Sequence, residues 1–265
     1  MSTETHAGED GFVNLSHLPF ETDGGIAARA AIGVIVLASD QTMEHEFRLL
    51  FDMPGVAMYE SRIWNDVIVT PDTLREMDGK IAEAARLILP GVELDVMAFG
   101  CTSASMVIGE ENVFKRIHEV RPGIACTTPI TSAFAAFRAF GAKRIGVLTP
   151  YRDDVNQVVR RYIEAQGFEV PAFGSFNEEN DSIAARITLE AVRDGVMTLN
   201  EAADVDAFFV SCTNVRLAGA AAEIEAATGK PVTSSNHAMA WHCLRLAGIE
   251  DERPEFGKLF TLPAG

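Results

Sequence analysis

The sequence predicts an α/β protein built from two similar halves, each with a parallel sheet covered by helices. Short apolar runs rich in β-branched residues alternate with amphipathic segments of helical period, which is the pattern of parallel strands joined by helical crossovers. Landmark residues also recur at nearly constant offsets. The pairs and their offsets are Gly33 and Gly146 (113), Cys101 and Cys212 (111), and Gly141 and Gly248 (107). We therefore expect a duplicated fold.

The first half is predicted element by element. The run AAIGVIVLA (30–38) is continuous and β-branched, as expected of a strand buried on both faces. Segment 70–89 is predicted to be helical, because Thr70 is a favoured N-cap and Pro71 suits the first helical position. The other predicted strands are 56–64, 94–100 and 124–129, and the other predicted helices are 110–123 and 130–141.

The second half repeats this order. Its predicted elements are a strand, a loop and a helix within 144–170, a helix over 182–195, a strand over 205–211, a helix over 214–229, a strand over 230–235 and a helix over 236–248. The domain boundaries follow as a lead-in over 1–25, a first α/β half over 26–142 and a second over 143–265. An exchange of part of the C-terminal segment into the first half stays open.

Composition narrows the classes of function. The chain has 265 residues, 48% of them hydrophobic, and a net charge of −16. So acidic a chain argues against nucleic acid as a partner, because phosphate backbones need clustered Lys and Arg. No apolar run approaches the roughly 20 residues that span a bilayer, and the polar N-terminus does not resemble a secretory signal. We expect a cytoplasmic protein with no membrane partner, whose four cysteines are reduced.

A Cys-Thr pair ends one buried strand in each half. The two stretches are DVMAFGCTSASMV (95–107) and DAFFVSCTNVRLA (206–218). Ligands collect at the carboxyl ends of parallel strands, so Cys101 and Cys212 are expected to face one shared cleft. A helix N-terminus after each cysteine would lower the thiol pKa. The neighbouring side chains that add hydrogen-bond donors and acceptors are Thr102, Ser103, Thr213 and Asn214.

Two thiols on opposite sides of a carbon atom could act as base and acid, or one could attack while the other donates a proton. The alternative is that both are small buried core residues. Cys126 and Cys243 lack this context and are expected to pack. His237 and His242 could serve as bases, although neither has an evident acidic partner. No phosphate-binding loop or metal-ligand cluster stands out, so no cofactor or metal is expected.

Several stretches carry a likeness to a known family. They are GVIVLASDQTMEHEF, AFGCTSAS, GVLTPYRDDVN, NDSIAARI, VSCTNVR and SSNHAMAWHCLRLAGI. With these the chain resembles the aspartate/glutamate racemase superfamily, in the branch of maleate cis-trans isomerase, arylmalonate decarboxylase and the ectoine-utilisation racemase-like proteins. The resemblance implies two flavodoxin-like halves related by a pseudo-twofold axis, an active site between them and no cofactor.

The same resemblance implies residue roles. Members that isomerise or racemise carry a cysteine on each side, whereas the decarboxylases keep only the second. Cys101 would then add to a carbon–carbon double bond and Cys212 would supply a proton, with Tyr151 and Asn180 binding carboxylate. This chain departs from the maleate isomerase pattern at Asp40, where those enzymes have Asn. An ionised Asp40 would attract an ammonium or amidinium group, unless it only caps the helix that begins nearby.

The expected function is a cofactor-independent two-cysteine isomerase or racemase acting on a small carboxylate. The alternatives are an arylmalonate-type decarboxylase that uses one cysteine, and a non-catalytic carboxylate-binding protein. We also expect a homo-oligomer.

Overall fold

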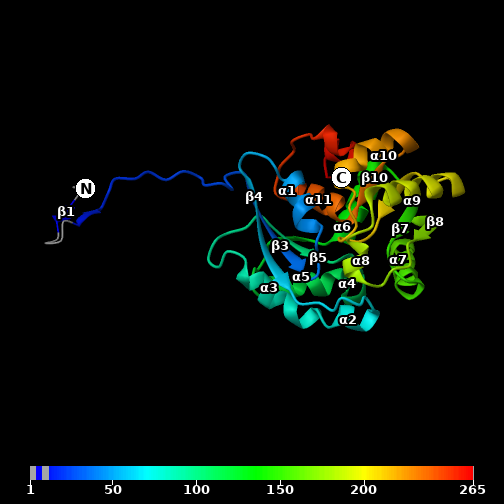
Figure 1. Ribbon diagram of the computed structural model, residues 1–265, viewed down its shortest axis with the longest axis horizontal. Coiled ribbons are helices and arrows are strands. Elements are labelled where there is room, and N and C mark those ends of the chain that lie inside the picture. The colour runs from blue at the N-terminus through cyan, green and yellow to red at the C-terminus, as the bar shows by residue number, and fades with distance from the viewer. Residues whose placement is uncertain (1–3, 8–11, 265) are drawn as a thin grey trace.

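The computed structural model describes residues 4–7 and 12–264, and in it the main body holds two four-stranded parallel sheets that lie side by side (Figure 1). The first sheet has the order β4-β3-β5-β6 and the second the order β10-β9-β7-β8. The strands are β3 (Ala30–Leu37), β4 (Val56–Ile63), β5 (Val96–Gly100), β6 (Ala125–Thr127), β7 (Arg144–Thr149), β8 (Glu169–Ser175), β9 (Ala207–Val210) and β10 (Val232–Ser234).

The two sheets share one topology. In each, the first strand along the chain lies inside the sheet, the second pairs on one side of it, and the third and fourth follow on the other side. All eight residues of β3 are buried, as expected for a central strand covered on both faces. The predicted α/β class with two parallel sheets is therefore confirmed.

Helices cover both sheets, with some boundaries that differ from the prediction. Those before β7 are α1 (Met43–Leu50), α2 (Pro71–Arg75), α3 (Ile81–Leu87), α4 (Thr102–Ile108), α5 (Glu110–His118) and α6 (Pro129–Phe140). The predicted helix over 70–89 is divided into α2 and α3 by a 3₁₀ turn, Asp78–Lys80. Gly79 in that turn favours a break, and the buried residues Leu74, Met77 and Ile81 pack in the same core cluster.

The remaining helices are α7 (Asp153–Ala165), α8 (Asp181–Ala184), α9 (Leu189–Ala202), α10 (Ala221–Thr228) and α11 (Ser235–Leu246). The prediction of a single helix over 182–195 is wrong, because α8 ends at Ala184 and Thr188 caps a separate helix, α9. The helix predicted over 214–229 begins only at Ala221, after a 3₁₀ turn over Ala218–Ala220. Residues 211–217 form an irregular loop.

The C-terminal segment packs in the core of the first sheet. Met239 and Trp241 of α11, and Phe260 beyond it, belong to the same buried cluster as Val34 of β3 and Val96 of β5. The N-terminal arm projects from the body (Figure 1) and includes the antiparallel strands β1 (Glu4–Ala7) and β2 (Val13–Ser16). No helix in the described part of the chain is long and apolar enough to cross a membrane.

Glu46 of α1 joins the first half to the loop of the second. Its carboxylate accepts hydrogen bonds from the backbone N–H groups of Leu217 and Ala218, both at 2.7 Å, and from Asn236 Nδ2 at 2.8 Å. The side chain is buried. One carboxylate therefore satisfies three buried hydrogen-bond donors. Glu46 and Leu217 are 171 residues apart in the chain.

We expect Glu46→Ala to lower the free energy of unfolding by about 3 kcal/mol or more, because each orphaned buried donor costs about 1–3 kcal/mol. The exposed neighbour His45 on the same helix supplies the control, His45→Ala, which should change stability little. Urea unfolding of the two variants measures the difference. Equal midpoints would show that the carboxylate does not hold the two halves together.

Candidate active site

A small enclosed cavity lies between the two halves, at the carboxyl ends of their strands. Both halves contribute to its lining: Leu37, Asn65, Asp66, Val69, Thr73, Leu74, Met77, Cys101, Thr102, Ser103, Tyr151, Asp181, Cys212 and Thr213. Its accessible volume is about 20 Å³, room for about one water molecule. The structure thus brings the two predicted cysteines to one cavity.

Cys101 follows β5 and is the N-cap of α4. Its Sγ accepts a hydrogen bond from the N–H of Ala104 at 3.4 Å and lies 3.8 Å from Ser103 Oγ. Burial nevertheless raises the pKa of the thiol to about 12, and the charges of Asp181 and Asp40 add to the rise. The start of α4 therefore does not bring the pKa of this thiol below its usual value, because desolvation outweighs the hydrogen bonds.

Cys212 follows β9, and here the predicted helix start is absent, since residues 211–217 form a loop. The Sγ accepts one hydrogen bond, from the N–H of Asn214 at 3.4 Å. Burial raises the pKa of this thiol well above its usual value, and the charge of Asp181 raises it further. The nearby Tyr151 hydroxyl acts in the opposite direction and lowers the pKa. Both thiols are therefore neutral at pH 7 in this structure.

Tyr151 connects the two sides of the cavity. It is buried after β7, lines the cavity together with both cysteines, and lies near enough to Cys212 and Ser103 for both to affect the pKa of its hydroxyl. Thr102 and Thr213 line the same space, one beside each cysteine. Of the six hydrogen-bonding side chains predicted from the sequence or from its resemblance to a family, four line the cavity, namely Thr102, Ser103, Tyr151 and Thr213. Asn180 and Asn214 do not line it.

Asn180 and Asn214 are used within the protein. The Asn180 side chain caps α8 by accepting from the N–H groups of Ser182 and Ile183. Asn214 Oδ1 accepts from the N–H of Gln41 at 2.8 Å and so ties the second half to the first. Neither residue lines the cavity. Both side chains are therefore engaged in hydrogen bonds within the protein in this structure.

Asp40 begins α1. Its Oδ1 accepts from the N–H groups of Thr42 and Met43, both at 2.8 Å, while its buried Oδ2 has no hydrogen-bond partner among the described residues. Burial raises the pKa of this carboxyl to about 7. Thr213 is near enough to lower that pKa slightly, without satisfying Oδ2. The capping alternative therefore describes Asp40 better than an ionised contact for a substrate cation.

Two acidic side chains line the cavity, Asp66 and Asp181, and the sequence analysis named neither. Asp66 is exposed and accepts from the N–H of Ile68, whereas Asp181 is buried and accepts a hydrogen bond from the Ser39 hydroxyl. Asn65 Nδ2 in turn donates to Ser39 Oγ at 2.7 Å. The sequence signal for Asp181 is the Asn-Asp pair at 180–181, of which the sequence analysis named only Asn180. Among the described residues that line the cavity, none is Lys, Arg or His.

The other cysteines and histidines lie elsewhere. His237 is buried between Thr233 and the backbone oxygen of Phe256, and burial lowers its pKa to about 4. His242 contacts the Thr127 hydroxyl at 2.8 Å, and burial likewise lowers its pKa to about 4. The packing role expected for Cys243 is confirmed by its place in the core of the first half. Neither histidine lines the cavity.

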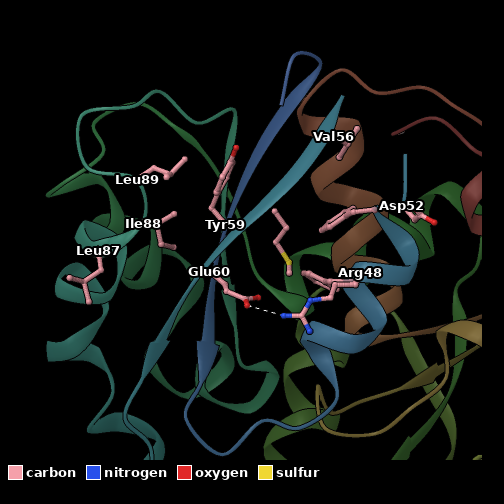
Figure 2. A pocket seen from close by; sticks show the side chains of 11 residues that line it. Arg48, Asp52, Val56, Tyr59, Glu60, Leu87, Ile88 and Leu89 are labelled. Atoms are coloured by element: carbon pink, nitrogen blue, oxygen red, sulfur yellow. Dashed lines mark hydrogen bonds and ion pairs between the residues drawn. The ribbon is translucent and has the colours of Figure 1, made fainter. Parts of the chain in front are cut away.

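A larger and more open hollow lies along β4, the edge strand of the first sheet (Figure 2). Its wall includes Tyr59 and Leu89, and an ion pair of 3.0 Å joins Arg48 and Glu60 across it. None of the predicted site residues lines this hollow. Size alone would favour it as a ligand site, but the convergence of two thiols favours the smaller cavity.

The fold and the cavity define a class of duplicated parallel α/β proteins with a cysteine from each half at the junction. Residues 66–260 match the family model described as arylmalonate decarboxylase. The chain therefore belongs to the arylmalonate decarboxylase and maleate isomerase family of the aspartate/glutamate racemase superfamily.

Individual relatives agree with this assignment. The chain is 28% identical to the maleate isomerase of Pseudomonas putida, over 87% of this chain and 96% of that protein. It is 32% identical to the arylmalonate decarboxylase of Bordetella bronchiseptica over 52% of this chain and 58% of that one. The structure of a maleate isomerase variant from Pseudomonas putida S16, solved with maleate, superposes with a TM-score of 0.80 at 26% identity, covering 88% of this chain and 97% of that one.

Proposed function

We propose that the chain is an isomerase or racemase that acts on a small carboxylate through Cys101 and Cys212. The observation that carries the proposal is the meeting of two buried free thiols, from equivalent strand ends of the two halves, at one cavity. A cysteine that only fills space in the core would not need an equivalent cysteine at the matching strand end of the other half. The relatives named above are maleate isomerases and an arylmalonate decarboxylase, which supports an enzymatic role.

Two reactions fit a pair of thiols. In a racemisation, one thiolate removes the proton on the carbon next to the carboxylate, and the opposite thiol returns a proton to the other face. In a cis-trans isomerisation, the Cys101 thiolate adds to one alkene carbon and leaves a carbanion on the next. The former double bond then rotates as a single bond, and expulsion of the thiolate restores the alkene. Cys212 would donate and recover the proton that stabilises the carbanion.

The remaining polar side chains of the cavity include both hydroxyl groups and carboxylates. We assign the substrate carboxylate to the hydroxyls of Thr102, Ser103, Tyr151 and Thr213, which can donate hydrogen bonds to it. Asp181 would repel a second carboxylate and attract a cationic nitrogen. Such a cation would also offset the charge that raises the pKa of both thiols. We therefore propose a substrate with one carboxylate and one cationic nitrogen.

We expect Asp181→Asn to make Cys212 more reactive. Removal of the carboxylate charge lowers the thiol pKa, and each unit by which the pKa falls raises the thiolate fraction about tenfold. Alkylation by iodoacetamide at pH 8, mapped by mass spectrometry, should therefore be faster at Cys212 than in the wild type. The exposed substitution Asp153→Asn is the control. Unchanged labelling in Asp181→Asn would show that Asp181 does not set the charge of the cavity.

The reaction itself is tested in deuterium oxide with a panel of α-amino acids, their cationic derivatives and unsaturated diacids. Racemisation places deuterium on the α-carbon, and isomerisation changes the alkene geometry. Decarboxylation of an arylmalonate releases carbon dioxide and would favour the decarboxylase alternative. Saturable binding with none of these changes would identify a carboxylate-binding protein and overturn the proposal.

A further inference from the structure

The loop that carries Cys212 is held by residues outside it. Residues 211–217 form neither helix nor strand. Two residues in the first turn of α11 contact it: the N–H of Cys212 donates to Ser235 Oγ at 3.0 Å, and Asn236 Nδ2 donates to the carbonyl oxygen of Thr213 at 2.7 Å. Because an irregular loop has no internal ladder of hydrogen bonds, such outside contacts decide where its thiol lies.

The Ser235 hydroxyl also reaches the other cysteine. Its Oγ lies 2.7 Å from Thr102 Oγ1, and Thr102 directly follows Cys101 in the chain. Two hydrogen bonds thus run from the residue after Cys101, through Ser235, to the backbone nitrogen of Cys212. Ser235 and Thr102 are both buried, so water does not compete strongly for these bonds.

We propose that Ser235 is a positioning residue that fixes the two cysteines relative to each other. The proposal rests on the two-cysteine function proposed above. Ser235 does not line the cavity, so it acts through its two partners rather than on the substrate. The two hydrogen bonds of Ser235 connect Thr102 in the first half to the backbone of Cys212 in the second half. In both reactions proposed above the two thiols act on one substrate, so the rate depends on the distance between the thiols.

We expect Ser235→Ala to lower kcat roughly 10- to 100-fold, because a displacement of about 1 Å at a reacting group can cost about a hundredfold. KM should change less than about threefold, since the hydroxyls assigned to the carboxylate remain. Thr102→Val should lower kcat through the same link, and it should also raise KM, because it removes a hydroxyl assigned to the carboxylate. The double variant should then lose no more activity than the more severe single variant, as expected when two substitutions break one coupled interaction.

Ser132→Ala is the matched control. Ser132 is also fully buried, with its Oγ 2.7 Å from Thr127 Oγ1, but it lies in α6 and does not line the cavity. A general cost of losing a buried hydroxyl should appear in both serine variants. An effect confined to Ser235→Ala identifies positioning.

A second readout does not depend on turnover. Loss of the Ser235 contact should free the loop, so iodoacetamide should label Cys212 roughly tenfold faster in Ser235→Ala than in Ser132→Ala, with Cys243 unchanged as the internal reference. Equal labelling of Cys212 and equal kcat in the two variants would overturn the role of Ser235. If the wild type turns over no compound in the panel, the proposed function fails, and the labelling ratio alone decides on Ser235.

Discussion

Replacing either Cys101 or Cys212 with alanine is expected to lower turnover by at least about a hundredfold, the scale on which acid–base and nucleophilic groups contribute. Each thiol comes from a different half and has a side chain at the same cavity, so neither can substitute for the other. Both residues are small and lie at strand ends, and alanine fits the same space. The fold should therefore survive, and steady-state kinetics on the identified substrate measure the loss.

Cys126→Ala is the control for this pair. Cys126 is half-buried in β6, and its thiol lies 3.5 Å from His118 Nε2, away from the cavity lining. Its removal should leave turnover within about threefold of the wild type, as for most substitutions outside a site. Near-normal activity in Cys101→Ala would contradict the two-cysteine mechanism. Together with full loss in Cys212→Ala, it would favour a reaction that uses one cysteine.

Asp40→Asn is expected to stabilise the protein at high pH. Burial raises the pKa of Asp40 from 3.8 to about 7. Between these values the folded protein keeps a proton that the unfolded chain has released, so stability falls as the pH rises through this window. At about 1.4 kcal/mol per pKa unit, the ionisation of Asp40 should lower the free energy of unfolding by about 2–3 kcal/mol between pH 5 and pH 8.

Asparagine keeps the oxygen that accepts from Thr42 and Met43, and it does not titrate. Urea unfolding at pH 5 and pH 8 should therefore show a smaller loss with pH in Asp40→Asn than in the wild type. Asp153→Asn, an exposed substitution, should follow the wild type. Parallel curves for the wild type and Asp40→Asn would contradict the raised pKa. A strong change in substrate preference would instead return Asp40 to the substrate site.

The sequence by itself determined the class of fold and the place of the cavity. Alternating apolar and amphipathic segments are local patterns, and strand and helix periods can be read from them directly. The repeated Cys-Thr pair located both thiols, because the carboxyl ends of parallel strands meet at one edge of a sheet. Element boundaries were less certain where a cap or glycine interrupts a helical pattern, as at Gly79 and Thr188.

Only the tertiary structure decided the electrostatics and the fine placement of the site. It showed Asp181 rather than Asn180 at the cavity, because one side chain caps a helix while its neighbour points inward. It also showed neutral thiols, since burial is a property of the assembled halves and no local pattern reports it. The link through Ser235 joins residues 133 positions apart. Hydrogen bonds of this kind depend on how two sheets pack, and therefore could not be predicted from spacing along the chain.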